Sequence, residues 1–208
     1  WHKNLGKIKI EGGTYDDKIV FYTALYHTLI DPRTCSDSNG EYRGADGKIY
    51  VSDRFDKRTI FSGWDVFRAQ MPLQTIINPQ VVNDLLNSLI ELADQSGKQY
   101  YERWEFFNAY SGCMLGNPAI SVLCDAYSKG IRNYDTDKAY RYAINSSNFF
   151  GNQPLGFTPG NSAISHTLEY AYTDWCLSQL AHWMGKNDES KQYEEKSKAY
   201  RHVFDKDY

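Results

Sequence analysis

An amphipathic helical pattern constrains the fold of this chain more than any other feature. Between Val81 and Leu92, apolar residues recur every three or four positions, shortly after Asn78-Pro79. This spacing places them on one face of an α-helix, and that face needs a partner surface to cover it. Similar patterns recur along the 208-residue sequence, so we expect helices packed on helices.

Seven segments carry helical patterns. An acidic first turn at Asp16-Asp17 suits the positive end of a helix dipole, and Gly185 is suited to ending a helix in the left-handed conformation. The predicted helices cover residues 16–29, 61–70, 81–92, 119–127, 135–145, 165–184 and 187–204. They predict an all-α architecture of helix pairs, and no fixed repeat period is visible.

Three segments interrupt the helical pattern. Residues 33–62 combine the turn sequences Asn39-Gly40 and Asp46-Gly47 with strand-forming residues, which predicts a long loop holding a small β-hairpin. Residues 149–161 are rich in Gly, Pro and Asn and predict a loop. Residues 104–116 predict a loop-to-helix junction, either functional or an irregular, aromatic-rich part of the core.

The composition excludes several classes of function. The net charge of −3 predicts no surface for nucleic acid, and the absence of an apolar run near 18 residues predicts no membrane span. Aromatic residues make up 15% of the chain, which suits sugar-binding surfaces and ordinary cores equally. The four cysteines form no CxxC pair, which argues against zinc, and we expect Cys113, Cys124 and Cys176 to be buried free thiols.

One helix start combines residues that could hold a sugar. Trp64 and Asp65 follow Ser62, a candidate helix cap, and Arg68 lies three positions after Asp65. A tryptophan ring can pack on the apolar face of a sugar while a carboxylate accepts from its hydroxyl groups. The alternative is a buried tryptophan beside an Asp65–Arg68 ion pair. Helix–helix hydrogen bonding is the expected role of Glu169 and Asp174.

Six stretches together are similar to one enzyme family, in the same order. The chain resembles the catalytic domain of family 92 of the glycoside hydrolases, the calcium-dependent exo-α-mannosidases, over nearly its whole length. The stretches are residues 21–28 (FYTALYHT), 37–44 (DSNGEYRG), 61–69 (FSGWDVFRA), 112–116 (GCMLG), 125–130 (DAYSKG) and 167–175 (TLEYAYTDW).

The resemblance implies a fold and an activity. It implies an (α/α)6 barrel, of which residues 1–208 form the N-terminal part, with a β-sandwich domain before the chain and the rest of the barrel after it. It implies inverting hydrolysis of terminal α-mannosides, with Ca²⁺ bound by ligands outside this chain and a periplasmic or secreted location. We therefore expect a mannose-containing glycan or mannosyl phosphate as substrate, and an inactive isolated fragment. The implied substrate-binding residues are Trp64, Asp65, Arg68, Trp104 and Cys113.

The position of the general acid departs from the family pattern. Aligned on Cys113-Met114, the family's general-acid glutamate corresponds to Tyr110, and its following Tyr-His pair corresponds to Asn117-Pro118. A sugar alcohol needs a proton as it leaves, and tyrosine is a far weaker acid than a tuned glutamic acid.

Three explanations of this substitution stay open. The leaving group departs without a proton, as a mannosyl phosphate would; Tyr110 or nearby Glu105 supplies the proton on an unusual linkage; or hydrolysis is lost and the protein only binds sugar. Glu105 could instead be structural. By the resemblance, the general-base aspartates lie beyond Tyr208.

Overall fold

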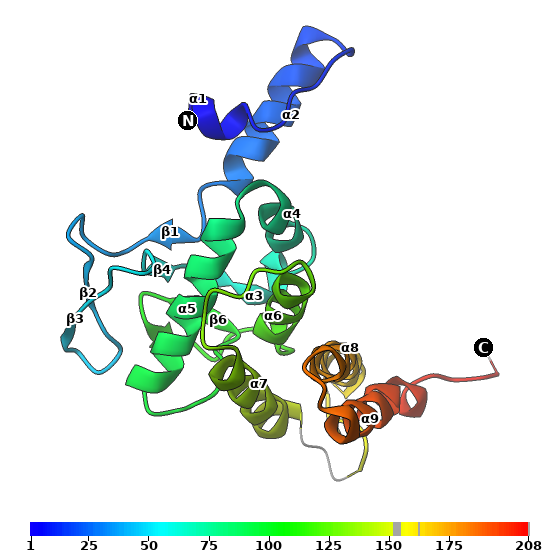
Figure 1. The fold of residues 1–208 in the computed structure, drawn as a ribbon. Coiled ribbons are helices and arrows are strands. Elements are labelled where there is room, and N and C mark those ends of the chain that lie inside the picture. Colours follow the sequence, from blue (N-terminus) through cyan, green and yellow to red (C-terminus); the bar gives the residue numbers. More distant parts are fainter. Residues whose placement is uncertain (152–154, 162, 208) are drawn as a thin grey trace.

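The computed structural model describes residues 1–151, 155–161 and 163–207, and this part of the chain is mainly helical (Figure 1). Its helices are α1 (His2–Leu5), α2 (Tyr15–Thr28), α3 (Gly63–Val66), α4 (Gln70–Ile77), α5 (Pro79–Gln95), α6 (Pro118–Ser128), α7 (Thr136–Gly151), α8 (Ala163–Trp183), α9 (Asn187–Lys196) and the 3-10 helix η1 (Ser197–His202). Its strands are β1 (Arg33–Thr34), β2 (Glu41–Arg43), β3 (Ile49–Val51), β4 (Arg58–Thr59), β5 (Phe61–Ser62), β6 (Trp104–Phe106) and β7 (Ala109–Tyr110).

Five of the seven predicted helices are confirmed with shifted ends, as α2, α5, α6, α7 and α8. Local chemistry explains where they begin. Thr14 and Asp17 form a reciprocal capping box at the start of α2, and Pro79 and Pro118 open α5 and α6, where a missing N–H costs nothing. The predicted seventh helix is divided into α9 and η1.

Three small antiparallel sheets accompany the helices. The predicted hairpin is confirmed as β2–β3, with Tyr42 paired to Tyr50. The expectation of an all-α chain with one hairpin is incomplete, because β1 pairs with β4 and a third sheet has the order β5-β6-β7. Both extra sheets pair segments that are distant in sequence, and no local pattern shows such pairing.

Two predicted segments are wrong in type. Residues 61–70 are not one helix: β5 comes first, then the single turn α3, and α4 starts only at Gln70. Residues 104–116 are not a loop entering a helix, because they form the β6–β7 hairpin and a following loop. The predicted loop at 149–161 begins later than expected, since α7 runs to Gly151; residues 152–154 of it lie outside the described part.

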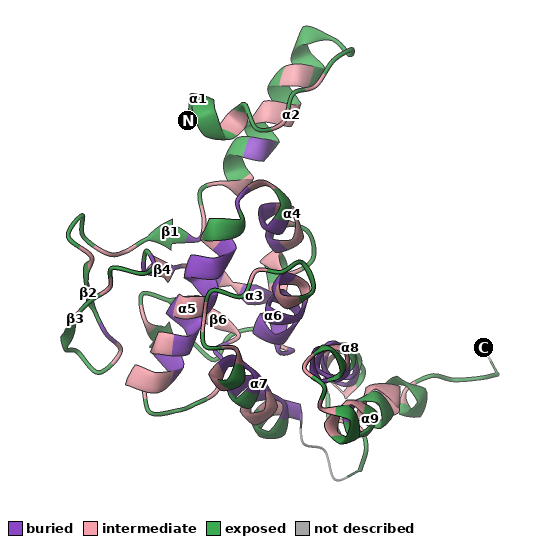
Figure 2. Cartoon of the chain, in the orientation of Figure 1, coloured by how far each residue is buried: buried purple, intermediate pink, exposed green. Residues whose placement is uncertain are grey.

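The core lies between α5, α6, α7 and α8, with β5 at its edge (Figure 2). The amphipathic face of α5 supplies Leu85, Leu86 and Leu89, each nearly inaccessible to solvent. Helix α8 lies along α6, α7 and α9 and joins the last two helical elements to the rest of the molecule. This helix-on-helix core agrees with the all-α expectation for most of the chain.

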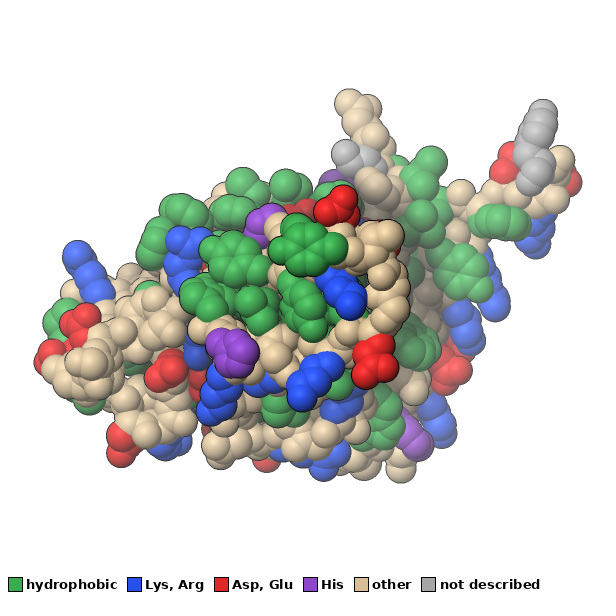
Figure 3. All heavy atoms as spheres, turned by 90° about the horizontal axis from the view of Figure 1, so that it is seen from above, with side chains coloured by type: hydrophobic (Ala, Val, Ile, Leu, Met, Phe, Trp, Pro, Cys, Tyr) green, Lys and Arg blue, Asp and Glu red, His purple; other side chains and the backbone are tan. Residues whose placement is uncertain are grey.

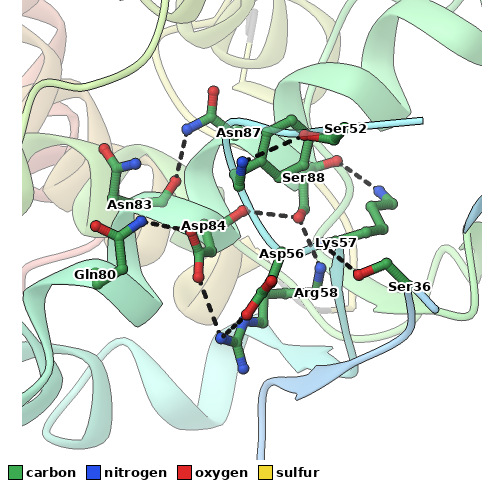
Figure 4. A network of polar contacts seen from close by, with 11 residues as sticks. Ser36, Ser52, Asp56, Lys57, Arg58, Gln80, Asn83, Asp84, Asn87 and Ser88 are labelled. Carbon is green, nitrogen blue, oxygen red and sulfur yellow. Dashed lines mark hydrogen bonds and ion pairs between the residues drawn. The ribbon is translucent and has the colours of Figure 1, made fainter. Parts of the chain in front are cut away.

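A polar network fastens β4 to α5 (Figure 4). Lys57 is buried, and its ammonium donates to the Ser88 carbonyl at 2.9 Å. Arg58 forms an ion pair with buried Asp84 at 3.1 Å, while its backbone N–H donates to Ser88 Oγ at 2.8 Å. These contacts fix β4, whose last residue, Thr59, donates a hydrogen bond to Glu105.

Helix α2 projects from the body of the molecule (Figure 1). Its apolar side chains lie all around its axis, and Tyr15, Ile19 and Val20 are exposed while only Leu25 is buried. Apolar side chains gather on the face seen in Figure 3, which looks down on this end of the molecule. A helix that is apolar on all sides is normally buried, so α2 is suited to packing against further protein.

The cysteines are free, as expected. Cys124 and Cys176 are buried, and the Cys124 thiol donates to the Cys176 carbonyl at 3.1 Å. The expectation that Cys113 is buried is wrong, because the hairpin leaves it on an exposed loop. Within the described ranges, no helix is long and apolar enough to cross a membrane.

Candidate active site

The three-stranded sheet β5-β6-β7 sorts the candidate residues onto two faces. Its register pairs Phe61 with Glu105 and Glu105 with Tyr110, whereas Ser62 pairs with Trp104. Directly paired residues place their side chains on one face, and neighbours along a strand point to opposite faces. Because Phe61 and Glu105 are buried, their face is the inner one. Ser62 and Trp104 therefore lie on the outer face.

The outer face carries a chain of hydrogen bonds that ends on an exposed carboxylate. The indole N–H of Trp104 donates to Ser62 Oγ, and this hydroxyl donates to Asp65. Ser62 occupies the N-cap position of α3, but its side chain makes no capping bond and binds Asp65 instead. The outcome is the Trp104 ring beside the exposed Asp65 carboxylate, whereas the expected sugar-binding pair is Trp64 and Asp65.

Glu169 on α8 contacts Trp64 and Arg68, which flank Asp65 in the chain, from far along the sequence. It accepts from the Trp64 indole N–H at 2.9 Å and from Arg68 at 3.1 Å. The Arg68 guanidinium also lies over the Trp64 ring, 4.8 Å from its centroid. The expected pairing of Arg68 with Asp65 is therefore wrong, whereas the expected helix–helix bonding of Glu169 is confirmed.

Two glycines allow the segments around this cluster to approach closely. A Cβ at Gly63 would lie 2.4 Å from the Arg103 carbonyl and 2.5 Å from a Pro118 carbon, so only glycine fits there. Gly116 adopts a φ of 75°, and a Cβ would lie 3.1 Å from Glu169. The loop after β7 is therefore in contact with the Trp64–Glu169 pair.

Tyr110 lies on the inner face, away from Trp104 and Ser62. Its hydroxyl donates to the Tyr100 carbonyl at 2.6 Å, and burial raises the pKa of the phenol well above its usual value. The Lys98 ammonium lies over the ring, 3.8 Å from the centroid. A phenol with a raised pKa and an engaged proton is a poorer acid than free tyrosine.

Glu105 is buried beneath the hairpin, with 2% of its surface exposed. Its carboxylate accepts from the Thr59 hydroxyl at 2.8 Å and from the Asn108 N–H at 2.6 Å. Thr59 in turn accepts from the Phe107 N–H at 2.8 Å. The carboxylate therefore holds the turn between β6 and β7.

The loop after β7 is tied back to β6. The Ser111 hydroxyl donates to the Trp104 carbonyl at 2.6 Å and accepts from the Cys113 N–H at 3.2 Å. Arg103 donates to the Gly112 carbonyl at 2.9 Å. Cys113 is thus held near the outer-face cluster with its thiol exposed.

The side chains that could hold calcium are scattered in the described part of the chain. Among the residues that the structure describes, no three His, Cys, Asp or Glu side chains gather where they could hold a metal ion. Calcium takes six to eight oxygen ligands, which a lone exposed Asp65 cannot provide. The expectation that its ligands lie outside this chain stays a prediction.

Sequence reasoning missed three members of the site region: Ser62 as a link, Thr59 and the contact made by Glu169. The sequence predicts Ser62 only as a helix cap, not as the link between Trp104 and Asp65. Thr59 lies 46 positions from its partner Glu105. Glu169 lies 105 positions from Trp64. Because the partners are so far apart in sequence, no local spacing could have indicated them.

Comparison with known proteins gives one consistent result. The profile of the glycosyl hydrolase family 92 catalytic domain matches residues 1–208. The structure is similar to the family GH92 alpha-mannosidase BT3965 from Bacteroides thetaiotaomicron, with a TM-score of 0.92 and 31% identity over 99% of this chain and 29% of that chain. It is also similar to the family GH92 inverting mannosidase BT2199 of the same organism, with a TM-score of 0.87 and 34% identity over 97% of this chain and 29% of that chain.

The match is limited in two respects. The chain spans less than a third of the length of these relatives. No curated protein sequence matches it. The family match nevertheless extends over the whole chain, and identity above 30% accompanies a nearly complete structural overlap. The chain therefore belongs to the catalytic domain of glycosyl hydrolase family 92.

Proposed function

We propose that the protein containing this chain hydrolyses terminal α-mannosides with inversion, aided by Ca²⁺, in the periplasm or outside the cell. We further propose that these residues form the first part of an (α/α)6 barrel. Family membership supports the class of reaction, and a structure of BT3965 in complex with mannoimidazole is among the similar structures. The observation that carries the proposal is the outer-face cluster: Trp104 is linked to Asp65 through Ser62, and the adjoining Trp64 and Arg68 are held by Glu169.

The proposed role of each residue follows from the part of its side chain that is exposed or not engaged in a hydrogen bond. Asp65 is exposed, so its carboxylate accepts from mannose hydroxyl groups. Trp64 and Trp104 are half-buried and held by their indole N–H groups, which leaves ring surface for the sugar. Arg68 is half-exposed and keeps N–H groups for a substrate oxygen, while the Cys113 thiol lines the rim.

The leaving group is the unusual part of the proposal. In an inverting reaction, water attacks the anomeric carbon on the face opposite the breaking C–O bond, and a base takes its proton. We place that base beyond Tyr208. The departing oxygen needs a proton only when it leaves as an alkoxide.

Tyr110 is poorly suited to give that proton, because its hydroxyl donates to Tyr100 and its pKa is raised by burial. Arg68 is half-exposed and brings a positive charge to the outer-face cluster. Cations favour a leaving group that departs as an anion. We therefore propose a preference for activated mannosides, above all mannosyl phosphates.

The test uses the full-length protein with calcium present. We expect release of mannose from a mannosyl phosphate and an aryl α-mannoside, little release from methyl α-mannoside, and loss of all release on chelation. Proton NMR should detect the β-anomer first. No turnover of any activated mannoside would refute the proposed hydrolysis.

Tyr110→Glu tests the leaving-group explanation. Position 110 faces inward, so the variant gains activity on methyl α-mannoside only when the glutamic acid reaches the departing oxygen and protonates it; if only the acid is missing, we expect that gain. Tyr110→Gln is the matched control, because it resembles glutamic acid in shape and has no acidic proton. Equal activity of the two variants would contradict the explanation.

The alternative is a carbohydrate-binding protein without catalysis. The burial and engagement of both Tyr110 and Glu105 favour it, because neither is free to act as an acid. It predicts binding of mannose in calorimetry with no turnover of any mannoside.

A further inference from the structure

An aromatic strip leads away from the candidate mannose site. It consists of Trp104, Phe106 and Phe107. The Trp104 and Phe106 rings are nearly parallel, with centroids 5.7 Å apart, and Phe107 meets Phe106 edge-on at 4.8 Å. Phe106 is 45% exposed and Phe107 is 56% exposed. Alternation along β6 accounts for the first two rings, since residues two apart share a face.

The turn that presents Phe107 adopts an unusual backbone conformation. Phe107 and Asn108 have φ values of 48° and 62°, as a two-residue hairpin turn of type I′ requires. Glycine and asparagine normally fill such turns, and a phenylalanine there is strained. The buried Glu105–Thr59 pair holds both N–H groups of the turn and so maintains the strain.

A polar hollow of about 430 Å³ lies at the end of the strip. Phe107 and Asn108 form one side of it, and Arg43, Gly44 and neighbouring residues of the β2–β3 segment form the other. The Asn108 amide donates to the Arg43 carbonyl at 2.7 Å, which joins the two sides. The Arg43 side chain is exposed and offers N–H groups to the hollow.

We propose that the aromatic strip and this hollow bind the glycan beyond the scissile bond, so that the enzyme favours a mannose on an oligosaccharide over a mannose on a small group. This inference rests on the proposed function. Trp104 belongs to both the strip and the mannose site, so an occupant of one continues into the other. Exposed aromatic rings that lead to guanidinium and amide groups match a sugar chain, which has apolar faces and hydroxyl edges.

The test removes the rings without disturbing the hairpin. Phe106→Leu keeps an apolar side chain, and Phe107→Asn keeps a residue that tolerates positive φ. Ile76→Ala, a change at an exposed residue of α4, is the matched control. Each variant of the full-length protein is assayed on α-mannosyl fluoride, which has no aglycone, and on a phosphate-linked mannotetraose, in which the terminal mannose is joined to a mannotriose through phosphate.

Each ring variant should lower kcat/KM on the tetrasaccharide about tenfold and change the fluoride rate by less than about twofold. Equal losses on both substrates, or none, would overturn the inference. A lower melting temperature with unchanged chain-length preference would also overturn it, because the strip would then be covered by the rest of the polypeptide.

Failure of the proposed function gives a different result. If nothing is hydrolysed, calorimetry with mannose and mannotetraose replaces the rates. Tighter binding of the tetrasaccharide that Phe106→Leu abolishes supports the strip in a non-catalytic protein. Binding of mannose with no dependence on chain length, or no binding at all, overturns the strip.

Discussion

Replacing Glu105 tests whether this carboxylate holds the β6–β7 hairpin or acts as the general acid. In the native protein, the Glu105 carboxylate accepts from the Thr59 hydroxyl at 2.8 Å and from the Asn108 N–H at 2.6 Å. Glu105→Ala removes this acceptor from both donors. Each buried unpaired donor costs about 1–3 kcal/mol, so the hairpin loses about 3 kcal/mol or more. Glu105→Gln keeps one acceptor oxygen, and we expect a loss of about 1 kcal/mol.

Hydrogen exchange of the full-length protein measures this locally. About 3 kcal/mol corresponds to roughly a hundredfold faster exchange of the Phe107 and Asn108 amides in Glu105→Ala, when exchange occurs through opening of the hairpin. Glu41→Gln, which changes an exposed carboxylate on β2, is the control and should leave these amides unchanged. If Glu105→Gln abolishes turnover while the exchange of both amides stays native, Glu105 is the acid and the reasoning is refuted.

Three further perturbations test the fold. Burial raises the pKa of Asp174 to about 6, although Lys196 opposes the shift. The free energy of unfolding therefore falls by about 3 kcal/mol as pH rises from about 4 to 6. In chemical denaturation, the Asp174→Asn variant should not show this fall. Gly63→Ala should cost more than about 2 kcal/mol or abolish folding, as judged by circular dichroism, because no Cβ fits there. Burial lowers the pKa of Lys57, so native stability rises with pH up to the unfolded pKa near 10.5. Chemical denaturation of Lys57→Met should show that this rise is lost, and an unchanged rise would contradict the reasoning.

Local sequence determined the helical part of the protein. The spacing of the apolar residues in α5 predicts which face of the helix is buried, and Pro79 marks the start of the helix. The hairpin β2–β3 followed from turn residues such as Asn39-Gly40. These elements could be predicted because their determinants lie within a few residues of one another.

The order of the motifs indicated the family, and alignment on Cys113-Met114 predicts that Tyr110 stands at the general-acid position. The site residues Trp64, Asp65 and Arg68 were identified from the same motifs, and the structure brings Trp64 and Arg68 together on Glu169.

Only the tertiary structure decided how the 104–110 segment is used. Strand β6 forms by pairing with β5, far earlier in the chain. Ser62 lies 42 positions before its partner Trp104, and Phe61 lies 44 positions before Glu105. That register turns Tyr110 and Glu105 inward and leaves Trp104 outside. A shift of one residue would exchange the two faces, and local sequence does not specify the register. The sequence therefore placed a tyrosine at the predicted acid position, while long-range strand pairing decided which way its hydroxyl points.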